Sequence, residues 1–367
     1  MTTDAIPQVE TAEIVLPCTE LDKTLPFFQN KLGFRVDAIF PADDPAVAVV
    51  SGHGVRLRLE RGAEGEPGAL RLLCPDLAGD AKELVAPNGT RIELVDADPP
   101  LDIPPLKESL VIARMGADAE FGAGRAGMGY RDLIPGRLGG RFIASHIRIP
   151  DAGPVPDNVH FHKVRFQMIY CYKGWVKVAY EDQGEPMLMK AGDCFLQPPE
   201  IRHRVLECSA GLEVVEIGCP ADHMTCLDHD MPLPTGKTLP DRDYGGQRFV
   251  FHQAEKAEWA PWRLDGFEAR DIGISAATDG LAGVKVARIS GTPAPQVSTH
   301  DAEFLFNFVL EGRVTLRAEG HGATELEPGD SFVVPSGLNH ALVDPTGDLE
   351  LLEVALPGGF ATTRVDA

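Results

Sequence analysis

Basic residues are scarce in this sequence, and they do not gather anywhere. The chain of 367 residues has 34 Lys and Arg against 55 Asp and Glu, which gives a formal net charge of −21 at pH 7. Nucleic acids and anionic lipid surfaces are held through clustered Lys and Arg. We therefore expect a small-molecule partner, and neither a nucleic acid nor a membrane.

Long apolar runs and paired cysteines are also lacking. No stretch approaches the ~18 apolar residues of a membrane helix, and the opening MTTDAIPQVETAEIVLP has neither the basic nor the apolar region of a signal peptide. We infer a cytoplasmic protein. The seven cysteines are odd in number and form no CxxC pair, so neither a disulfide framework nor a zinc knuckle is indicated.

Short strand-like runs make up most of the chain, and long amphipathic helices are scarce. The 38 Gly and 30 Pro are spread between these runs, which is typical of many strands joined by tight turns. Strand and helix patterns alternate in residues 1–97, and a Pro-rich linker follows at 98–106. Two strand-rich domains, 107–230 and 231–367, complete a mainly β protein.

The two strand-rich segments repeat one another. YRDLIPGRLGGRFIASHIRI at 130–149 matches ARDIGISAATDGLAGVKVARI at 269–289 with a one-residue offset, and GDCFLQPPEIRH is echoed by GDSFVVPSGLNH. Such self-similarity indicates duplicated units. We expect two equivalent β domains in which Arg131, and its counterpart Arg270, brace the entrance strand.

The segment NVHFHKVRFQMIYCYKG, residues 158–174, carries the strongest chemical signal. His160 and His162 are two residues apart, so on a strand both side chains point to the same face. Gln167 follows them, and His203 ends the GDCFLQPPEIRH motif. An isolated HxH pair is more often an ordinary pair of surface or core residues, so the interpretation depends on the wider spacing.

That spacing resembles the two-part motif of the cupin superfamily, GX5HXHX3-4EX6G and GX5PXGX2HX3N. The match holds at every metal position except one, where Gln167 stands for the usual Glu, and Glu200 stands where the second motif has Gly. The resemblance implies a bicupin of two tandem double-stranded β-helix (jelly-roll) barrels. It also implies that His160, His162 and His203 ligate a divalent metal, with Gln167 as a weak neutral ligand or a hydrogen-bond donor beside it.

The implied metal is most simply Fe(II), although three neutral histidines with open positions also accept Mn, Ni, Co, Cu or Zn. An amide in place of a carboxylate raises the charge of the site by one unit, which favours an anionic substrate. In the second barrel the four ligand positions fall on Ser298, His300, Leu305 and His340. We expect His300 and His340 to form a weak site at most, in a degenerate, metal-free barrel.

Residues 1–97 resemble the vicinal oxygen chelate family of glyoxalases and extradiol dioxygenases in EIVLPCTELDKTLPFFQNKLGFRV, VRLRLE and APNGTRIELVD. The resemblance implies a small α+β domain with a βαβββ order. The family's metal positions fall at Glu13, Glu60, Ala69 and Glu93, a set without histidine. We therefore expect a structural or substrate-sensing role for this domain.

The candidates for catalysis in the first barrel are Gln167, Arg165, Arg202 and Tyr170. The arginines flank metal positions and can clamp a carboxylate, but strand arginines more often face outward. Tyr170 lines a pocket in one interpretation and fills the core in the other.

The sequence favours a mononuclear non-haem Fe(II) dioxygenase for a small enolisable, phenolic or aromatic acid, because open metal positions can hold substrate and O2 together. An isomerase or lyase is an alternative that needs an acid or base near the metal, for which Glu200, Glu207 and the tyrosines are available. A non-catalytic metal- or metabolite-binding bicupin is another. We expect a homodimer formed through edge strands.

Overall fold

The computed structural model describes residues 8–77, 79–116 and 119–365. The chain forms two compact units, residues 1–100 and 101–367, so the first ends three residues beyond the expected 97. In the part of the chain that is described, no helix is long and apolar enough to cross a membrane.

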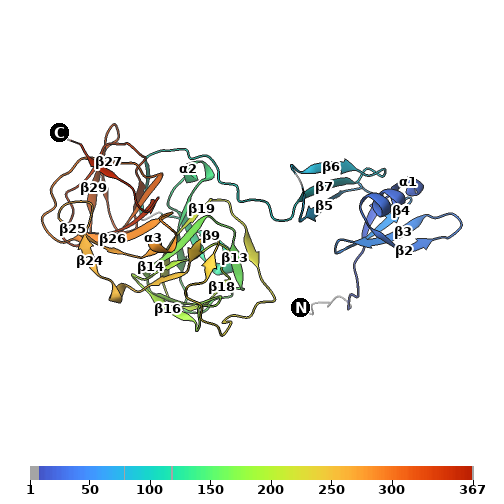
Figure 1. Ribbon diagram of the computed structural model, residues 1–367, viewed down its shortest axis with the longest axis horizontal. Helices are drawn as coiled ribbons and strands as arrows, with labels where there is room; N and C mark the ends of the chain where they lie inside the picture. Colours follow the sequence, from blue (N-terminus) through green and yellow to red (C-terminus); the bar gives the residue numbers. More distant parts are fainter. Residues whose placement is uncertain (1–7, 78, 117–118, 366–367) are drawn as a thin grey trace. The chain divides into compact units, whose positions relative to one another are not determined.

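The first unit opens with a β-α-β-β-β segment (Figure 1). Its first sheet has the order β1-β4-β3-β2, with β1 parallel to β4, and contains β1 (Ile14–Pro17), β2 (Arg35–Phe40), β3 (Val47–Gly52) and β4 (Val55–Glu60). Helix α1 (Leu21–Pro26) and the π-helical turn η1 (Phe27–Lys31) follow β1. The second sheet has the order β5-β7-β6 and contains β5 (Ala69–Cys74), β6 (Lys82–Val85) and β7 (Arg91–Asp96).

The expected element order is present, but two of its three carboxylate positions are used in ion pairs. Glu13 accepts a hydrogen bond from Arg56 at 2.8 Å, and Glu60 accepts one from Arg58 at 2.5 Å. Among the described residues, the only group of three or more His, Cys, Asp or Glu side chains placed to hold a metal lies in the second unit. Arginine side chains therefore occupy the carboxylates of Glu13 and Glu60.

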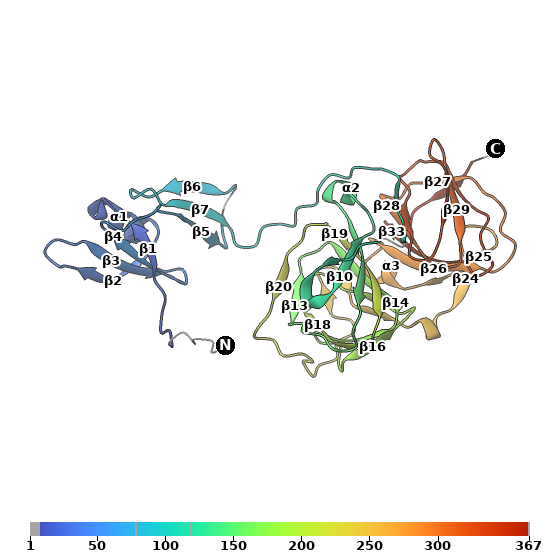
Figure 2. The same cartoon turned by 180° about the vertical axis from the view of Figure 1, so that it is seen from behind.

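The second unit consists of two β barrels, each with a large and a small sheet (Figure 2). The first barrel's large sheet has the order β23-β17-β14-β19-β11-β10-β9 and contains β9 (Gly122–Ala123), β10 (Gly129–Asp132), β11 (Ile143–Ile149), β14 (Phe166–Lys173), β17 (Cys194–Leu196), β19 (Leu212–Cys219) and β23 (Val250–His252). Its small sheet has the order β16-β15-β18-β13-β20 and contains β13 (His160–His162), β15 (Trp175–Tyr180), β16 (Met187–Lys190), β18 (His203–Cys208) and β20 (Thr225–Leu227).

The second barrel repeats this arrangement. Its large sheet has the order β24-β25-β26-β33-β28-β31-β8 and contains β8 (Val111–Ala113), β24 (Trp259–Pro261), β25 (Phe267–Asp271), β26 (Gly283–Ile289), β28 (Phe304–Glu311), β31 (Ser331–Val333) and β33 (Glu350–Leu356). Its small sheet has the order β30-β29-β32-β27-β34 and contains β27 (Ser298–His300), β29 (Val314–Ala318), β30 (Gly322–Leu326), β32 (His340–Val343) and β34 (Thr362–Arg364). The duplication predicted from the repeat is therefore present in the fold.

The two barrels exchange their first strands. Strand β8, which precedes the first barrel, pairs with β31 of the second, and β23, which precedes the second barrel, pairs with β17 of the first. Two matched arginines hold the exchange: Arg131 donates to Gly329 O at 2.5 Å, and Arg270 donates to Gly192 O at 2.9 Å. A boundary at residues 230 and 231 consequently does not separate two independent sheets.

The largest core lies between the barrels. Strand β14 has period-two alternation, so one set of its side chains faces the other barrel while Gln167 and Ile169 lie on the inward face. The interface is made by buried aromatic and sulfur-containing side chains from β14 and β28, namely Phe166, Met168, Tyr170, Phe304, Phe306 and Phe308. Tyr170 therefore belongs to the inter-barrel core.

Candidate metal centre

Three imidazoles meet on the small sheet of the first barrel. His160 on β13 lies directly opposite His203 at the start of β18, and His162 is two residues further along β13. The potential ligand atoms of the three side chains lie within 4.8 Å of one another. The structure thus brings together the three histidines predicted from the motif.

The hydrogen bonds of these rings leave one nitrogen of each available. His160 Nδ1 lies 2.7 Å from Asn158 O, and His203 Nδ1 lies 3.0 Å from Ile201 O. A carbonyl oxygen only accepts, so each Nδ1 carries the proton and each Nε2 presents a lone pair. His162 Nδ1 lies 3.0 Å from the hydroxyl of Thr225, which can accept in the same way. This outer hydrogen bonding is the arrangement that orients metal-binding histidines.

Burial keeps all three rings neutral, the form that binds metal. It lowers the pKa of His162 to about 2, with smaller contributions from the neighbouring imidazoles. The pKa of His203 is well below its ordinary value, and that of His160 is lowered, in both cases mainly by burial. The donor set therefore fits a divalent metal such as Fe(II) or Zn.

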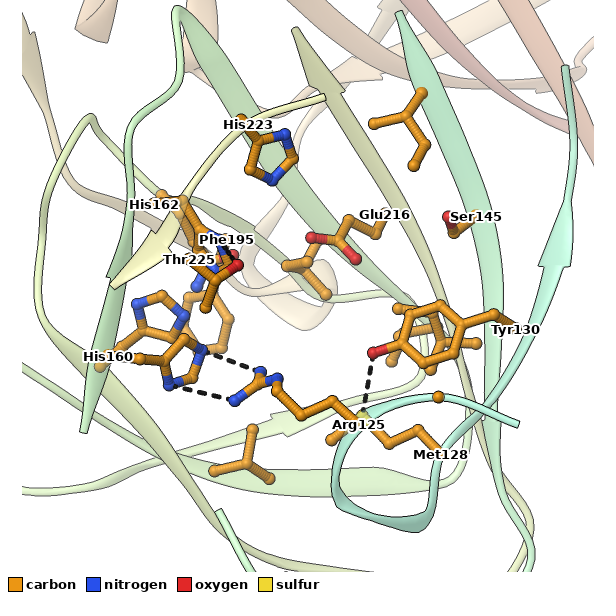
Figure 3. Close-up of a pocket in the computed structure, with 18 of the residues that line it drawn as sticks. Arg125, Met128, Tyr130, Ser145, His160, His162, Phe195, Glu216, His223 and Thr225 are labelled. Carbon is orange, nitrogen blue, oxygen red and sulfur yellow. Dashed lines mark hydrogen bonds between the residues drawn. The ribbon is translucent and has the colours of Figure 1, made fainter. Parts of the chain in front are cut away.

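The histidines line a cavity of about 970 Å³. Most of its wall is apolar and is formed by Ile147, Ile149, Ile169, Val176, Val178, Met189, Phe195, Val205, Leu212 and Val214. Figure 3 shows Arg125, Tyr130, Glu216 and His223 turned toward the same space as the histidines. The cavity thus has a large apolar volume and one polar region.

Arg125 is a cationic side chain in direct contact with His160. It lies in the 3-10 turn η2 (Arg125–Gly127) between β9 and β10, and its Nη2 donates to His160 Nε2 at 2.9 Å (Figure 3). Asp157, whose side chain is 1% exposed, holds the guanidinium through an ion pair of 2.5 Å. Arg125 therefore contacts the lone pair of His160 that a metal would use, and a metal would replace this contact.

Glu216 places a carboxyl group in the cavity. It lies on β19 opposite Ser145 and Ile169, and Gln167 Nε2 donates to its Oε1 at 2.5 Å. Burial raises the pKa of Glu216, although the amide of Gln167 and the charges of His223 and Arg125 oppose this. The position of Gln167 agrees with the donor role that we expected as one of its two alternatives.

His223 is a fourth imidazole of the cavity wall. Its Nδ1 donates to Pro220 O at 2.9 Å, which leaves Nε2 with a lone pair. Its ring centroid lies 5.4 Å from that of His162. Together with Glu216 it can accept or donate a proton beside the three-histidine group.

None of the four candidates for catalysis is among the described residues that line the cavity, and three of them make their contacts elsewhere. Arg165 lies near Glu303 of the second barrel, at 3.5 Å. Arg202 packs over the ring of Phe161 at 3.9 Å, and Tyr170 accepts a hydrogen bond from Arg270 at 3.2 Å within the inter-barrel core. Arg165 precedes β14 and Arg202 precedes β18, and neither is among the described residues that line the cavity, so their outward-facing interpretation fits the structure.

The two departures from the cupin motif have separate consequences. Glu200 adopts a φ of 61°, and Gly337, its counterpart in the second barrel, has a φ of 75°. Glycine is preferred at such left-handed positions because it lacks a Cβ. The departure at Gln167 instead supplies the amide that binds Glu216. Glu200 and Glu207 are not among the described residues that line the cavity, whereas Glu216, which the sequence-based search missed, lines it together with Asp132 and Asp222.

The second barrel uses its histidines differently. His300 Nε2 lies 3.1 Å from Val334 O, and its Nδ1 accepts the Ala302 N–H at 3.1 Å, so both ring nitrogens are occupied. His340 Nδ1 lies 3.0 Å from Leu338 O. Burial and the charge of His340 lower the pKa of His300 to about 4. The weak two-histidine site considered from the sequence therefore lacks a free lone pair on His300.

The residues that sequence reasoning missed had two recognisable signals. Glu216 is the single carboxylate on a strand face that otherwise carries Leu212 and Val214, both of which line the cavity. Arg125 and Arg263 occur at corresponding places in the two repeats, before β10 and β25 respectively. No local pattern distinguished His223, because its position depends on the loop that follows β19.

Comparisons with known proteins agree with this fold. A model of the family described as Cupin domain matches residues 289–355. A salicylate 1,2-dioxygenase from Pseudaminobacter salicylatoxidans is 16% identical and has a TM-score of 0.53, covering 72% of this chain and 91% of that chain. An oxalate decarboxylase from Lactobacillus farciminis, solved as a formate complex, is 14% identical and has a TM-score of 0.52, covering 72% and 92%.

A mutant of Bacillus subtilis oxalate decarboxylase is 12% identical, with a TM-score of 0.51 and coverage of 72% of this chain and 80% of that chain. A search of curated proteins found no match. At these identities the likeness concerns the fold. The chain thus contains a segment that matches the cupin domain, within a double-barrel fold that it shares with these three structures.

Proposed function

We propose that the first barrel is the active site of a metal-dependent enzyme, most simply an Fe(II) dioxygenase acting on a small enolisable, phenolic or aromatic acid. The observation that carries this proposal is the group of three neutral imidazoles, His160, His162 and His203, at the wall of a large cavity. When bound there, the metal would supply open coordination positions for an anionic oxygen of the substrate and for O2.

The chain's own residues bind and orient the substrate in this proposal. The apolar wall from β11, β15 and β19 excludes water and accepts a ring or an aliphatic body. Arg125, anchored by Asp157, directs its guanidinium into the polar region and can hold a carboxylate by two parallel hydrogen bonds. The acid group of the substrate therefore lies on the same side of the cavity as the three histidines.

Proton transfer falls to Glu216 and His223. Burial raises the pKa of Glu216, and its carboxyl is held by the amide of Gln167 at 2.5 Å. His223 Nε2 is a free acceptor in the same wall. These groups serve a dioxygenase by taking the proton of an enol or phenol, and they also meet the requirement of an isomerase or lyase for an acid or base. The isomerase or lyase alternative is therefore tested together with the dioxygenase.

The first test is metal content, measured by mass spectrometry on protein purified without a His tag or chelator. We expect about one iron per chain, and its loss in His160→Ala. Phe161→Leu is the matched control because it changes the intervening residue of β13 without removing an imidazole. Absence of a bound metal, with none taken up anaerobically, would reject the enzyme proposal in favour of a metabolite-binding protein.

Oxygen consumption separates the two enzyme classes. The iron-loaded protein is offered phenolic acids and enolisable acids with and without O2. Stoichiometric O2 uptake supports the dioxygenase, whereas turnover without O2 supports the isomerase or lyase. We expect Arg125→Gln to raise KM for acid substrates more than for their amides, because only the acids can form the paired hydrogen bonds.

For residues 1–97 we propose a vicinal-oxygen-chelate-like domain with a structural or substrate-sensing role. Its β-α-β-β-β order and the parallel pairing of β1 with β4 support this assignment. The pairing of Glu13 with Arg56 and of Glu60 with Arg58 argues against catalysis.

A further inference from the structure

The wall of the first barrel's cavity changes from polar to apolar along two neighbouring strands of the large sheet. Every second residue of a strand faces inward. On β11 and β19, three pairs of opposite residues line the cavity in order, namely Ser145 with Glu216, Ile147 with Val214, and Ile149 with Leu212. We call the first pair the polar layer and the other two pairs the apolar layers.

The small sheet has the same order. Strand β18 begins with His203 of the metal centre, and Val205 follows two residues later, opposite Val178 of β15. All three side chains line the cavity. Val178 and Val214 belong to one contiguous apolar cluster, and Val205 packs against it. The apolar side chains of both sheets therefore enclose a single apolar space beside the three histidines.

The charged side chains of the cavity wall lie outside this apolar space. Asp132 and Glu216 are at the level of the polar layer, and Arg125 contacts a histidine of the metal centre. Arg137 donates to Asp222 at 3.1 Å, and the side chain of Asp222 is 93% exposed, so this pair lies at the surface. A charged group of a ligand is consequently favoured at one end of the cavity and disfavoured at the other.

Part of the apolar wall is accessible from the cavity. Ile169 and Val205 are only partly buried, although β14 and β18 each have a neighbouring strand on both sides. Both side chains face inward, since Ile169 lies opposite Glu216 and Val205 lies two residues beyond His203. Removing apolar surface from water is favourable in proportion to its area. A ligand with an apolar body gains this free energy by covering the two side chains.

The depth of the apolar layers sets the length of the group that fits. Ser145 and Ile149 are four residues apart (149 − 145) on β11. This separation corresponds to roughly 13 Å along a strand, and to about 10 Å of depth at a barrel tilt of about 40°. An extended carbon chain advances about 1.2 Å per bond, because three backbone bonds span at most about 3.6 Å. About eight carbons therefore reach from the polar layer to the last apolar pair.

A one-ring acid would leave most of the cavity unfilled. At about 30 Å³ per water molecule, the volume of about 970 Å³ equals roughly 30 waters, which is far more than the number of non-hydrogen atoms in such an acid. The side chains of the apolar layers are isoleucine, valine and leucine, so these layers offer no ring face for stacking. Size and chemistry together favour an aliphatic body over a single aromatic ring.

We propose that the substrate is an enolisable aliphatic acid whose tail of about eight carbons occupies the apolar layers. Its acid group lies beside the three histidines and Arg125, and its tail ends beside Ile149 and Leu212. This inference rests on the proposed function for the reaction at the acid end, and it narrows the substrate classes considered there to one. Val205 and Ile149 then determine which tail lengths are accepted.

The test is calorimetric titration of the full-length protein, both chelator-treated and loaded anaerobically with Fe(II). The probes are straight-chain carboxylates from butanoate to dodecanoate, below their micelle-forming concentrations. We expect the affinity to rise about two- to fourfold with each added CH2, and to stop rising at about eight to ten carbons. Benzoate should bind more weakly than heptanoate, which has the same number of carbons. An affinity that does not depend on chain length, or no saturable binding by any probe, would overturn the proposal.

Two variants of β18 show whether the tail lies in the cavity. Val205→Phe fills part of the apolar space, so we expect it to weaken decanoate binding at least tenfold and to leave butanoate binding within twofold. Arg204→Phe is the matched control, because it adds the same side chain at the neighbouring exposed position. Equal effects of the two variants on decanoate would place the tail elsewhere and overturn the proposal. Near-UV circular dichroism checks folding, and Ile149→Phe replaces Val205→Phe if the latter is not folded.

Metal content and O2 uptake keep this inference distinct from the proposed function. A protein that holds iron and consumes O2 with short acids, but binds all chain lengths equally, would overturn the inference and leave the proposed function intact. Length-dependent binding by a protein that takes up no metal would overturn the proposed function. The cavity would then remain a binding site for an aliphatic acid, as inferred from its layers.

Discussion

The two barrels have the same strand order and nearly the same registers, yet they present different chemistry in their small sheets. In the first, His160 lies opposite His203; in the second, Ser298 lies opposite His340. Serine in place of histidine removes one imidazole, but the larger change is at His300. Both of its ring nitrogens are engaged by backbone groups, so a histidine is present and cannot act as a ligand.

This comparison shows that the availability of a nitrogen decides whether a histidine can bind metal. In the first barrel the backbone carbonyls of Asn158 and Ile201 accept the Nδ1 protons and leave Nε2 unprotonated, and only the side chain of Arg125 contacts the Nε2 of His160. In the second barrel the carbonyl of Val334 accepts from the Nε2 of His300 instead. The sequence motif does not reveal this difference. Backbone carbonyl and N–H groups determine it, and every residue type except proline provides both.

The largest expected effect comes from removing one imidazole from each barrel. His162→Ala should reduce metal affinity by more than the roughly 10–100-fold that loss of an outer hydrogen-bond partner costs, because it removes a ligand. His340→Ala should leave metal content unchanged. Mass spectrometry of both purified variants measures this, and full metal occupancy in His162→Ala would reject the assignment of His162.

The matched arginines of the strand exchange should contribute alike to stability. Arg131 donates to Gly329 O and to Arg114 O, and Arg270 donates to Gly192 O and to His252. We expect Arg131→Met and Arg270→Met each to lower the free energy of unfolding by about 2–4 kcal/mol, because buried acceptors lose their donors. Chemical denaturation measures this, and a large effect in one variant alone would show that the two exchanges are not equivalent.

Glu213 in the first barrel and Glu350 in the second occupy corresponding positions. Their contributions to the stability of the fold should change with pH in opposite directions. Glu213 lies opposite Lys173 and Arg148, whereas Glu350 lies opposite Glu311 and Arg288. Burial alone would raise the pKa of Glu213, but the hydrogen bond from His146 and the charges of Lys173 and Arg148 lower it to about 2. Burial raises the pKa of Glu350, and Glu311 adds to this.

The signs of the two stability effects follow from these shifts. The lowered pKa of Glu213 stabilises the fold above about pH 4.5, and this stabilisation is lost as the pH falls toward 2. At 1.36 kcal/mol per pKa unit it is roughly 3 kcal/mol at most. The raised pKa of Glu350 makes stability fall as the pH rises above 4.5. At pH 7 we expect Glu213→Gln to destabilise and Glu350→Gln to stabilise, and unfolding midpoints measured across this pH range check both signs.

The smallest expected effect is that of restoring the missing histidine. Ser298→His places an imidazole at the position that corresponds to His160, opposite His340. We expect the metal content to stay at one ion per chain, because His300 keeps both nitrogens in backbone hydrogen bonds. A second ion in this variant would show that His300 is released easily and would contradict the account given above.

Part of this architecture could be predicted from the sequence, since its signals are local or repeated. The HxH spacing on β13 and the Gly/Pro motif before His203 located the three histidines, and the internal repeat predicted two barrels. The first unit's β-α-β-β-β order was also readable from its strand and helix patterns. These features depend on side-chain alternation and turn residues, which neighbouring positions specify.

The remainder depends on contacts between distant segments. Arg125 contacts His160 across 35 residues of chain, and nothing near either residue indicates the other. Arg165 and Arg202 were close in sequence to the ligand positions, but their side chains contact Glu303 and the ring of Phe161 instead of the cavity. The strand exchange could not be predicted from the sequence either. Strands β8 and β23 are short, and each pairs with a strand of the barrel that does not follow or precede it directly in its own repeat.

The exchanged strands also determine the order in which the two similar barrels can be completed during synthesis. Val250 of β23 pairs with Leu196, which the ribosome has released 54 residues earlier (250 − 196), so the first barrel's large sheet is complete soon after residue 252 emerges. Val111 of β8 pairs with Val333, 222 residues later (333 − 111). At about 5–20 residues per second, that partner follows by roughly 10–45 s. In the last part of this interval, after residue 252, β8 still has no partner strand although the large sheet of the first barrel is complete.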